Sequence, residues 1–531
     1  MDPKAAQLHP RRWWALGALV ASTLVLGFDM TILNVALPTM AAQLGASTGE
    51  QQWIVDSYIV VFAALMLPAG LLGDRYGRRR MLVAGLVVFL AGALAGTLAG
   101  TPALVIAARG VMGMGAALVA PLSLAVLPSL FGPEERGKAV AAVTAATASG
   151  LPLGPMIGGW LLDHYWWGSI FLINVPLVAL GIAACLWLLP ETLPHSPEGM
   201  GGAPTPSAPR IGVLSTLFSA AGLGALVLGF IEAPARGWSD PLVLALLGGS
   251  VVLVAALVLR ERRAARPMLD LRLLARRGFL WNTVTVTLGS FVISGLLFLL
   301  PAHLQTVLGY DAFGTGLRLL PLMAGIVVAA KAAAPLTGRL GPRPVVAAGL
   351  VVLCFAALLG ARTGPGDGYV FTAVWLSVAG LGFGFALMPA MDGAIGDVPA
   401  QEAGSGSALL QTFKQVGTAL GVALLGSLMA GAYAGRLDTS GLPAAAADAA
   451  DDSVVGAHMV AERLGLPRLA ASADEAYLHG MGLVLVACAF AALATALLVA
   501  LLLPNPRRAA GPDPVPVAVH GVAAGRGDSR E

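Results

Sequence analysis

Charged residues are scarce in this chain of 531 residues, where aspartate, glutamate, lysine and arginine together make up 11%. A soluble domain carries about 25% of them. Hydrophobic residues make up 57% of the chain, and the mean hydropathy is +0.81. Because so few polar residues cannot cover soluble domains, the composition excludes a soluble protein. It indicates an all-α protein that crosses a membrane many times, without a nucleic-acid partner.

Cysteine and histidine are also rare, with three and seven residues. Cys185, Cys354 and Cys488 each lie in an apolar run, which predicts small buried side chains and no disulfide. The histidines show no metal-ligand spacing. We therefore expect no metal, no cofactor and no enzyme activity.

Apolar segments long enough to span a bilayer, which takes about 20 residues, fill most of the chain. We predict fourteen of them, at residues 13–37, 51–73, 81–99, 103–129, 138–162, 168–189, 211–231, 241–260, 278–301, 315–337, 345–362, 369–391, 404–431 and 479–503.

Lysine and arginine are concentrated in alternate loops, and this bias predicts which loops of the protein face the cytoplasm. The densest clusters are at 75–80 and 260–266, and we place them in the cytoplasm. Four predicted outer loops carry neither residue: 38–50, 100–102, 163–167 and 302–314. An even number of spans then puts both termini in the cytoplasm, and we expect a multi-pass protein of the cytoplasmic membrane.

The motif GLLGDRYGRRRML, residues 70–82, follows the second segment. Its glycines permit close packing and a sharp turn, and its arginines hold the loop inside. The motif resembles the signature loop of the major facilitator superfamily, in which it latches the cytoplasmic side of the outward-open state. The resemblance implies a cytoplasmic gate made of Gly70, Asp74, Arg75, Gly77, Arg78 and Arg79. The alternative is a plain basic turn.

The motif GLPLGPMIGG, residues 150–159, lies in the fifth segment. It resembles the antiporter motif of the superfamily's drug exporters, and this implies export rather than import. The residues that would pack the helices are Gly150, Gly154, Pro155, Gly158 and Gly159. The alternative is an ordinary seam of small residues.

Three further stretches resemble the fourteen-helix branch of the drug:proton antiporters: FDMTILNVALP (28–38), WIVDSY (53–58) and FLINVP (171–176). The resemblance implies two six-helix bundles with a helix pair inserted between them, working by alternating access. The predicted parts are an N-terminal tail (1–12), a first bundle (13–189), a linker (190–210), the inserted pair (211–260), a second linker (261–277), a second bundle (278–503) with a long outer loop (432–478), and a disordered tail (504–531).

Three charged residues interrupt the apolar segments: Asp29, Asp56 and Arg109. Counted from the segment ends at about 1.5 Å per residue, all three lie roughly 8–13 Å below the outer surface. If they share a wet cavity, Arg109 neutralises one carboxylate and the other holds a proton near neutral pH. Alternatively, each acid is a structural pair or cap, and the arginine extends to the interface. Further candidates for the cavity are Asn34, Gln411, Lys414 and Gln415.

We therefore predict a proton-coupled exporter of hydrophobic, cationic drugs, antibiotics or natural products. Its energy source is the proton gradient, and its partners are small-molecule substrates, protons and the lipid bilayer. We expect a monomer. The alternatives are an importer or symporter of another small metabolite, which the antiporter motif disfavours, and a membrane-embedded enzyme or sensor, for which no catalytic cluster or soluble domain is found.

Overall fold

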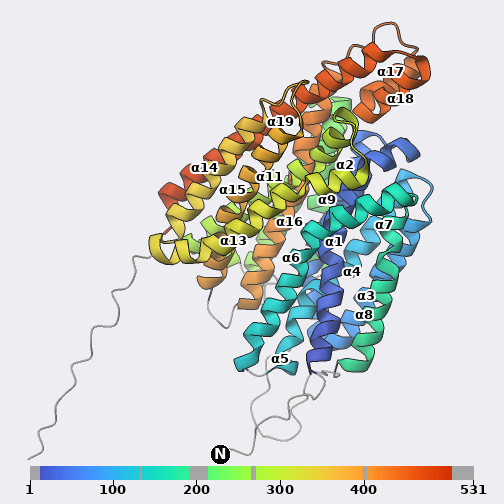
Figure 1. Cartoon of the computed structure of the whole chain (residues 1–531). Helices are drawn as coiled ribbons and strands as arrows, with labels where there is room; N and C mark the ends of the chain where they lie inside the picture. Colours follow the sequence, from blue (N-terminus) through green and yellow to red (C-terminus); the bar gives the residue numbers. More distant parts are fainter. Residues whose placement is uncertain (1–11, 132, 190–212, 265–270, 399–402, 505–531) are drawn as a thin grey trace, which may run out of the picture.

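The computed structural model describes residues 12–131, 133–189, 213–264, 271–398 and 403–504, and these residues form helices and no strand (Figure 1). The predicted linker at 190–210 lies outside them, as do 1–11 of the predicted N-terminal tail and 505–531 of the predicted C-terminal tail. The all-helical prediction is confirmed for the described part of the chain.

The N-terminal half contains six long helices. They are α1 (Arg12–Leu44), α2 (Thr48–Tyr76), α3 (Arg78–Thr97), α4 (Pro102–Ala125), α6 (Pro133–His164) and α8 (Asn174–Leu188), with short helices α5 (Leu127–Leu130) and α7 (Ser169–Leu172). Within this half α1 packs on α6, and α4 packs on α2 and α3. Buried apolar side chains line these contacts, and exposed ones face outward as in a protein solvated by lipid.

The C-terminal half repeats this plan. Its long helices are α11 (Arg277–Ala302), α13 (Leu320–Leu340), α14 (Pro342–Gly360), α15 (Tyr369–Gly396), α16 (Ala403–Ala434) and α19 (Pro467–Leu502), and its short elements are the π-helix η2 (His303–Val307), α12 (Ala312–Arg318), α17 (Ala444–Asp452) and α18 (Val454–Leu464). Along the chain, the two halves are separated by α9 (Val213–Arg236), α10 (Pro241–Arg263) and the 3₁₀-helix η1 (Leu271–Ala275).

Twelve helices in the described part of the chain are long and apolar enough to cross a membrane. Two more predicted segments, 51–73 and 138–162, correspond to α2 and α6, whose side chains are described only in part. The count of fourteen spans therefore stays a prediction. Cys185, Cys354 and Cys488 are buried free thiols, as predicted.

The two halves are joined at the end of the molecule that carries the predicted outer loops, which we call the outer end. Gln305 of η2 donates a hydrogen bond to the Val35 carbonyl of α1 (2.8 Å). Two backbone N–H groups of α12 reach α6 nearby. At the same end α2 packs against α16.

Helices α17 and α18 lie over this outer end, above α2 and α11 (Figure 1), and we call residues 444–464 the outer cap. Thr48 of α2 donates a hydrogen bond to the Asp452 carbonyl. Tyr433 donates one to the Ala450 carbonyl (3.2 Å), and His458 pairs with Asp474 (2.8 Å). The predicted long outer loop is thus mostly helical and rests on both halves.

The outer cap is expected to be more stable in acid. Burial is the main cause that raises the pKa of Asp451, and the neighbouring Asp448 carboxylate adds to it. Burial is also the main cause that raises the pKa of Asp452, to which the carboxylates of Asp448, Glu50 and Asp451 add. The folded cap therefore binds protons more tightly than the unfolded segment, so its stability falls as the pH rises above the ordinary carboxyl range near 4. Hydrogen exchange should show higher protection of 444–464 at pH 5 than at pH 7.5.

Asp452→Asn is the control for this prediction. The amide has no charge to lose, so the difference in protection between the two pH values should shrink. Equal protection of the native cap at both pH values would show that these carboxylates do not govern it.

Candidate functional site

Asp29 and Arg109 form an ion pair inside the N-terminal half. The Arg109 Nη1 atom donates to Asp29 Oδ2 at 2.7 Å, and both side chains are 2% exposed. Their helices are α1 and α4, so the pair joins two spans. A buried charge at this depth is tolerated only with a close partner, and each residue supplies the other's.

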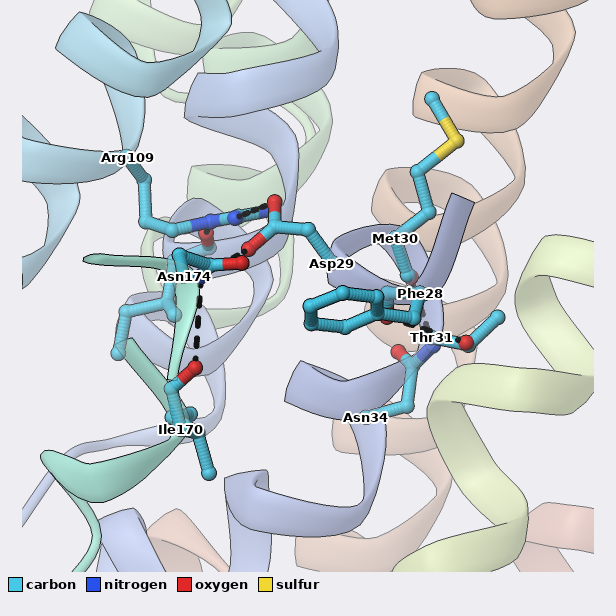
Figure 2. Close-up of polar contacts among 9 residues, drawn as sticks. Phe28, Asp29, Met30, Thr31, Asn34, Arg109, Ile170 and Asn174 are labelled. Atoms are coloured by element: carbon cyan, nitrogen blue, oxygen red, sulfur yellow. Dashed lines mark hydrogen bonds and ion pairs between the residues drawn. The ribbon is translucent and has the colours of Figure 1, made fainter. Parts of the chain in front are cut away.

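Three more residues complete this cluster. Asn174 of α8 donates to the second Asp29 oxygen at 3.4 Å, and the Arg109 Nε atom donates to the Ile54 carbonyl of α2 at 3.3 Å. The Tyr58 ring stacks against the guanidinium group, 4.3 Å from ring centroid to Cζ. Figure 2 shows Asp29 pointing toward Arg109 and Asn174, away from Asn34. Four helices are thus tied at one level.

The expectation of a wet cavity at Asp29 is wrong for this state. Asp29 is 1% exposed and faces α4 and α8, inside one half. The reason is the rotation of α1, which turns Met30 outward (36% exposed) and Asp29 inward. Asp29 is therefore enclosed by its own half of the protein in this state.

Asp56 lies on α2, two residues after Ile54, and is fully buried. Neither of its carboxylate oxygens has a hydrogen-bond partner among the described residues. The structure thus separates the two acids, because Arg109 pairs with Asp29 and Asp56 is left alone. A charged group buried without a partner is costly, so Asp56 differs from Asp29 in lacking a compensating cation.

Other buried polar atoms without partners gather on the same helix. They are Gln52 Nε2, Ser57 Oγ and Tyr58 Oη. Native proteins leave few such atoms unpaired, and each demands a reason. One such reason is that the polar groups of α2 have different partners in another state of the protein.

The predicted cytoplasmic gate is described in part. Gly77, with φ of 98°, ends α2 and begins α3, a backbone conformation that glycine adopts without strain. Arg78 donates to the Ala125 carbonyl at the end of α4 (2.6 Å), and Arg79 donates to the Leu186 carbonyl of α8 (2.6 Å). The surroundings of Gly70, Asp74 and Arg75 lie outside the described residues. Arg78 and Arg79 thus connect the start of α3 to the cytoplasmic ends of α4 and α8.

The glycines of the predicted antiporter motif stand at two close contacts. A Cβ atom on Gly150, Gly154 or Gly158 would lie within 2.5 Å of α1, and one on Gly159 would lie 2.4 Å from the Ala312 carbonyl oxygen. The buried Pro155 adjoins the second contact, since its carbonyl oxygen would lie 2.2 Å from a Cβ on Gly316. The motif therefore packs α6 against both its own half and α12 of the other.

Gly154→Ala is expected to destabilise the protein. The new methyl group would lie 2.1 Å from Thr31 Oγ1 and 2.8 Å from the Phe28 carbonyl oxygen, so α1 and α6 must separate. Overpacking of this kind costs about 1–3 kcal/mol. The melting temperature in detergent should fall.

Gly17→Ala in α1 is the matched control, because nothing lies within 4 Å of a Cβ at Gly17. This substitution should leave the melting temperature unchanged or raise it, since alanine favours the helix. An equal fall for both variants would contradict the packing role of Gly154.

The remaining cavity candidates lie on α1 and α16. Asn34 donates to the Met30 carbonyl at 3.4 Å, and Gln415 is 6% exposed. Lys414 and Gln411 are partly buried, and no ion pair is found for Lys414 within the described ranges. Of the predicted residues, the structure brings Asp29 and Arg109 into contact and leaves Lys414 on another helix.

Sequence reasoning missed Asn174 and Tyr58. Both stand in recognised stretches, at 171–176 and 53–58, but an asparagine or a tyrosine in a helix gives no sign of which partner it meets. In the described parts of the chain no group of three histidine, cysteine, aspartate or glutamate residues is placed to hold a metal.

The sequence model of the Major Facilitator Superfamily matches residues 19–422. The puromycin resistance protein pur8 of Streptomyces alboniger is 36% identical over 445 residues, covering 83% of this chain and 86% of that protein. The multidrug efflux pump LfrA of Mycolicibacterium smegmatis is 30% identical over 502 residues, covering 94% and 97%.

The fold is also found among solved structures. A bacterial homologue of the human lysosomal transporter Spinster, in an inward-facing and unoccupied conformation, superposes with a TM-score of 0.67. It is 17% identical, with 93% of this chain and 98% of that chain covered.

Proposed function

Because this chain belongs to the Major Facilitator Superfamily, we propose that it exports hydrophobic, cationic drugs, antibiotics or natural products in exchange for protons. Relatives at 30–36% identity are named for puromycin resistance and multidrug efflux, which supports export. The proposal includes fourteen spans, both termini in the cytoplasm, and a monomer in the cytoplasmic membrane that needs no cofactor.

The observation that carries the coupling is the unpartnered carboxyl group of Asp56. Burial favours its neutral form as long as the outer end is closed. When that end opens, water reaches the group and a proton can be exchanged; when the cytoplasmic end opens, a cationic substrate can take the proton's place. The site thus holds either a proton or a cation, as an antiporter requires.

The paired cluster has a different role in this proposal. The ion pair of Arg109 with Asp29 joins α4 to α1 inside the N-terminal half. With Asn174 and the Ile54 carbonyl it fixes the outer part of α2 beside Asp56. The gate residues Gly77 to Arg79 would then hold the cytoplasmic ends, and the glycine motif would seal α6 against leaks.

The test is transport in liposomes with a pH-sensitive dye inside. A proton gradient is imposed, and ethidium or puromycin is added to the purified protein. We expect substrate-dependent proton movement, and no such movement in protein-free liposomes. The same response should persist in Asp438→Asn, which removes an exposed carboxylate of the outer loop. Proton and substrate movement in the same direction would replace antiport with symport, and no response to either compound would contradict the cationic-drug proposal.

A further inference from the structure

Asp163 contacts the other half of the molecule through two hydrogen bonds. It stands at the outer end of α6, where its Oδ1 atom accepts from the Ala312 N–H (3.2 Å) and its Oδ2 atom from the Phe313 N–H (2.9 Å). Both donors belong to α12 in the C-terminal half. One carboxylate therefore uses both oxygens across the boundary between the halves.

These donors have no substitute partner within α12. The first N–H groups of a helix lack an acceptor one turn earlier, and they carry partial positive charge. Asp311 precedes the helix, and its side chain accepts from the Gly314 N–H (2.7 Å) rather than from Ala312 or Phe313. The N–H groups of Ala312 and Phe313 are thus left to Asp163, and separating the halves here would leave both to water.

The surrounding backbone is packed closely enough to hold this geometry. A Cβ on Gly159, one turn before Asp163, would lie 2.4 Å from the Ala312 carbonyl oxygen, and one on Gly316 would lie 2.2 Å from the Pro155 carbonyl oxygen. The hydrogen bond from Gln305 to the Val35 carbonyl also joins the halves. Movement at the outer end must therefore break the bonds of Asp163.

We propose that Asp163 is the latch of the outer end: its two hydrogen bonds form when the outer end closes and break each time it opens. The inference rests on alternating access, proposed above, and adds the residue that sets the balance between the two states. Asp163 binds neither substrate nor proton in this role. Its effect is on the conformational equilibrium.

The latch is tested by measuring the distance between two spin labels on the outer ends of α3 and α15. Leu98 (82% exposed) and Val370 (76% exposed) offer labelling sites, one in each half. Cys185, Cys354 and Cys488 are first replaced by alanine. In Asp163→Ala, the ratio of the long-distance to the short-distance population should rise about 2- to 30-fold, the range of losing such a cap.

Two variants keep the test decisive. Asp311→Ala removes a cap of the same helix from its own half, so it should lower the melting temperature without changing the distance ratio. Asp163→Asn retains one acceptor oxygen and should give a smaller rise than alanine. An unchanged ratio in Asp163→Ala, or an equal rise in Asp311→Ala, would overturn the latch. Because the measurement uses no substrate and no proton gradient, its outcome is independent of the transport test.

Discussion

Arg109→Met is expected to remove most of the folded protein, and adding Asp29→Asn to it is expected to restore the fold. The single change leaves the Asp29 carboxylate buried among α4 and α8 without its cation. Breaking a buried ion pair in this way costs about 3–5 kcal/mol. In the double variant both charges are gone, and the amide introduced at position 29 still offers an oxygen to Asn174.

The measurement is a double-mutant cycle on melting temperature and on the yield of monodisperse protein in detergent. Asp29→Asn alone should cost less than Arg109→Met, because the amide oxygen remains an acceptor for the guanidinium group. The control is Arg236→Met, which breaks the exposed pair with Glu232 and should leave both quantities unchanged. Additive losses in the double variant would mean that the pair is not what stabilises these helices.

Asp56→Asn is expected to leave the fold intact and abolish proton coupling. The asparagine side chain is nearly isosteric with the neutral carboxyl group, and Asp56 makes no hydrogen bond to any described residue, so the melting temperature should not change. Without a titratable group at this place, uphill export in liposomes should fall at least about 100-fold, the lower end of what a positioned proton-transferring group contributes.

Substrate counterflow separates coupling from simple inactivation. Exchange of labelled for unlabelled substrate needs no net proton movement, so it should continue in Asp56→Asn with the proton gradient collapsed. Loss of counterflow as well would assign Asp56 to substrate binding or to conformational change. Proton movement that survives in Asp56→Asn would move the coupling to another group, Asp29 first.

The long helices could be predicted from apolar runs because lipid demands about 20 apolar residues for each span. Their ends could not. Helix α19 begins at Pro467 rather than at 479, because its first turns carry polar residues such as Asp474 that pair with the outer cap. Helix rise likewise placed Asp29, Asp56 and Arg109 at one depth, which the contact between Arg109 and the Ile54 carbonyl supports.

The sequence could not predict which of the charged residues at this depth form the ion pair. Which acid meets Arg109 depends on the rotation of three helices about their own axes, and a rotation of α1 by about 100° would exchange Asp29 for its exposed neighbour Met30. Asn174 reaches Asp29 from 145 residues away. The latch at Asp163 was missed for a similar reason, since an acid in a short outer loop gives no sign of its partner until α12 is placed beside it.

The position of α9 decides how this pump faces the bilayer. The helix packs against α2 of one half and α16 of the other, and Ser427 of α16 donates a hydrogen bond to the Phe230 carbonyl. It therefore covers one of the two seams at which the halves meet, while α6, α12 and α13 meet at the second. A compound dissolved among the lipid tails therefore meets α9 at the first seam and the contacts of α6 with α12 and α13 at the second.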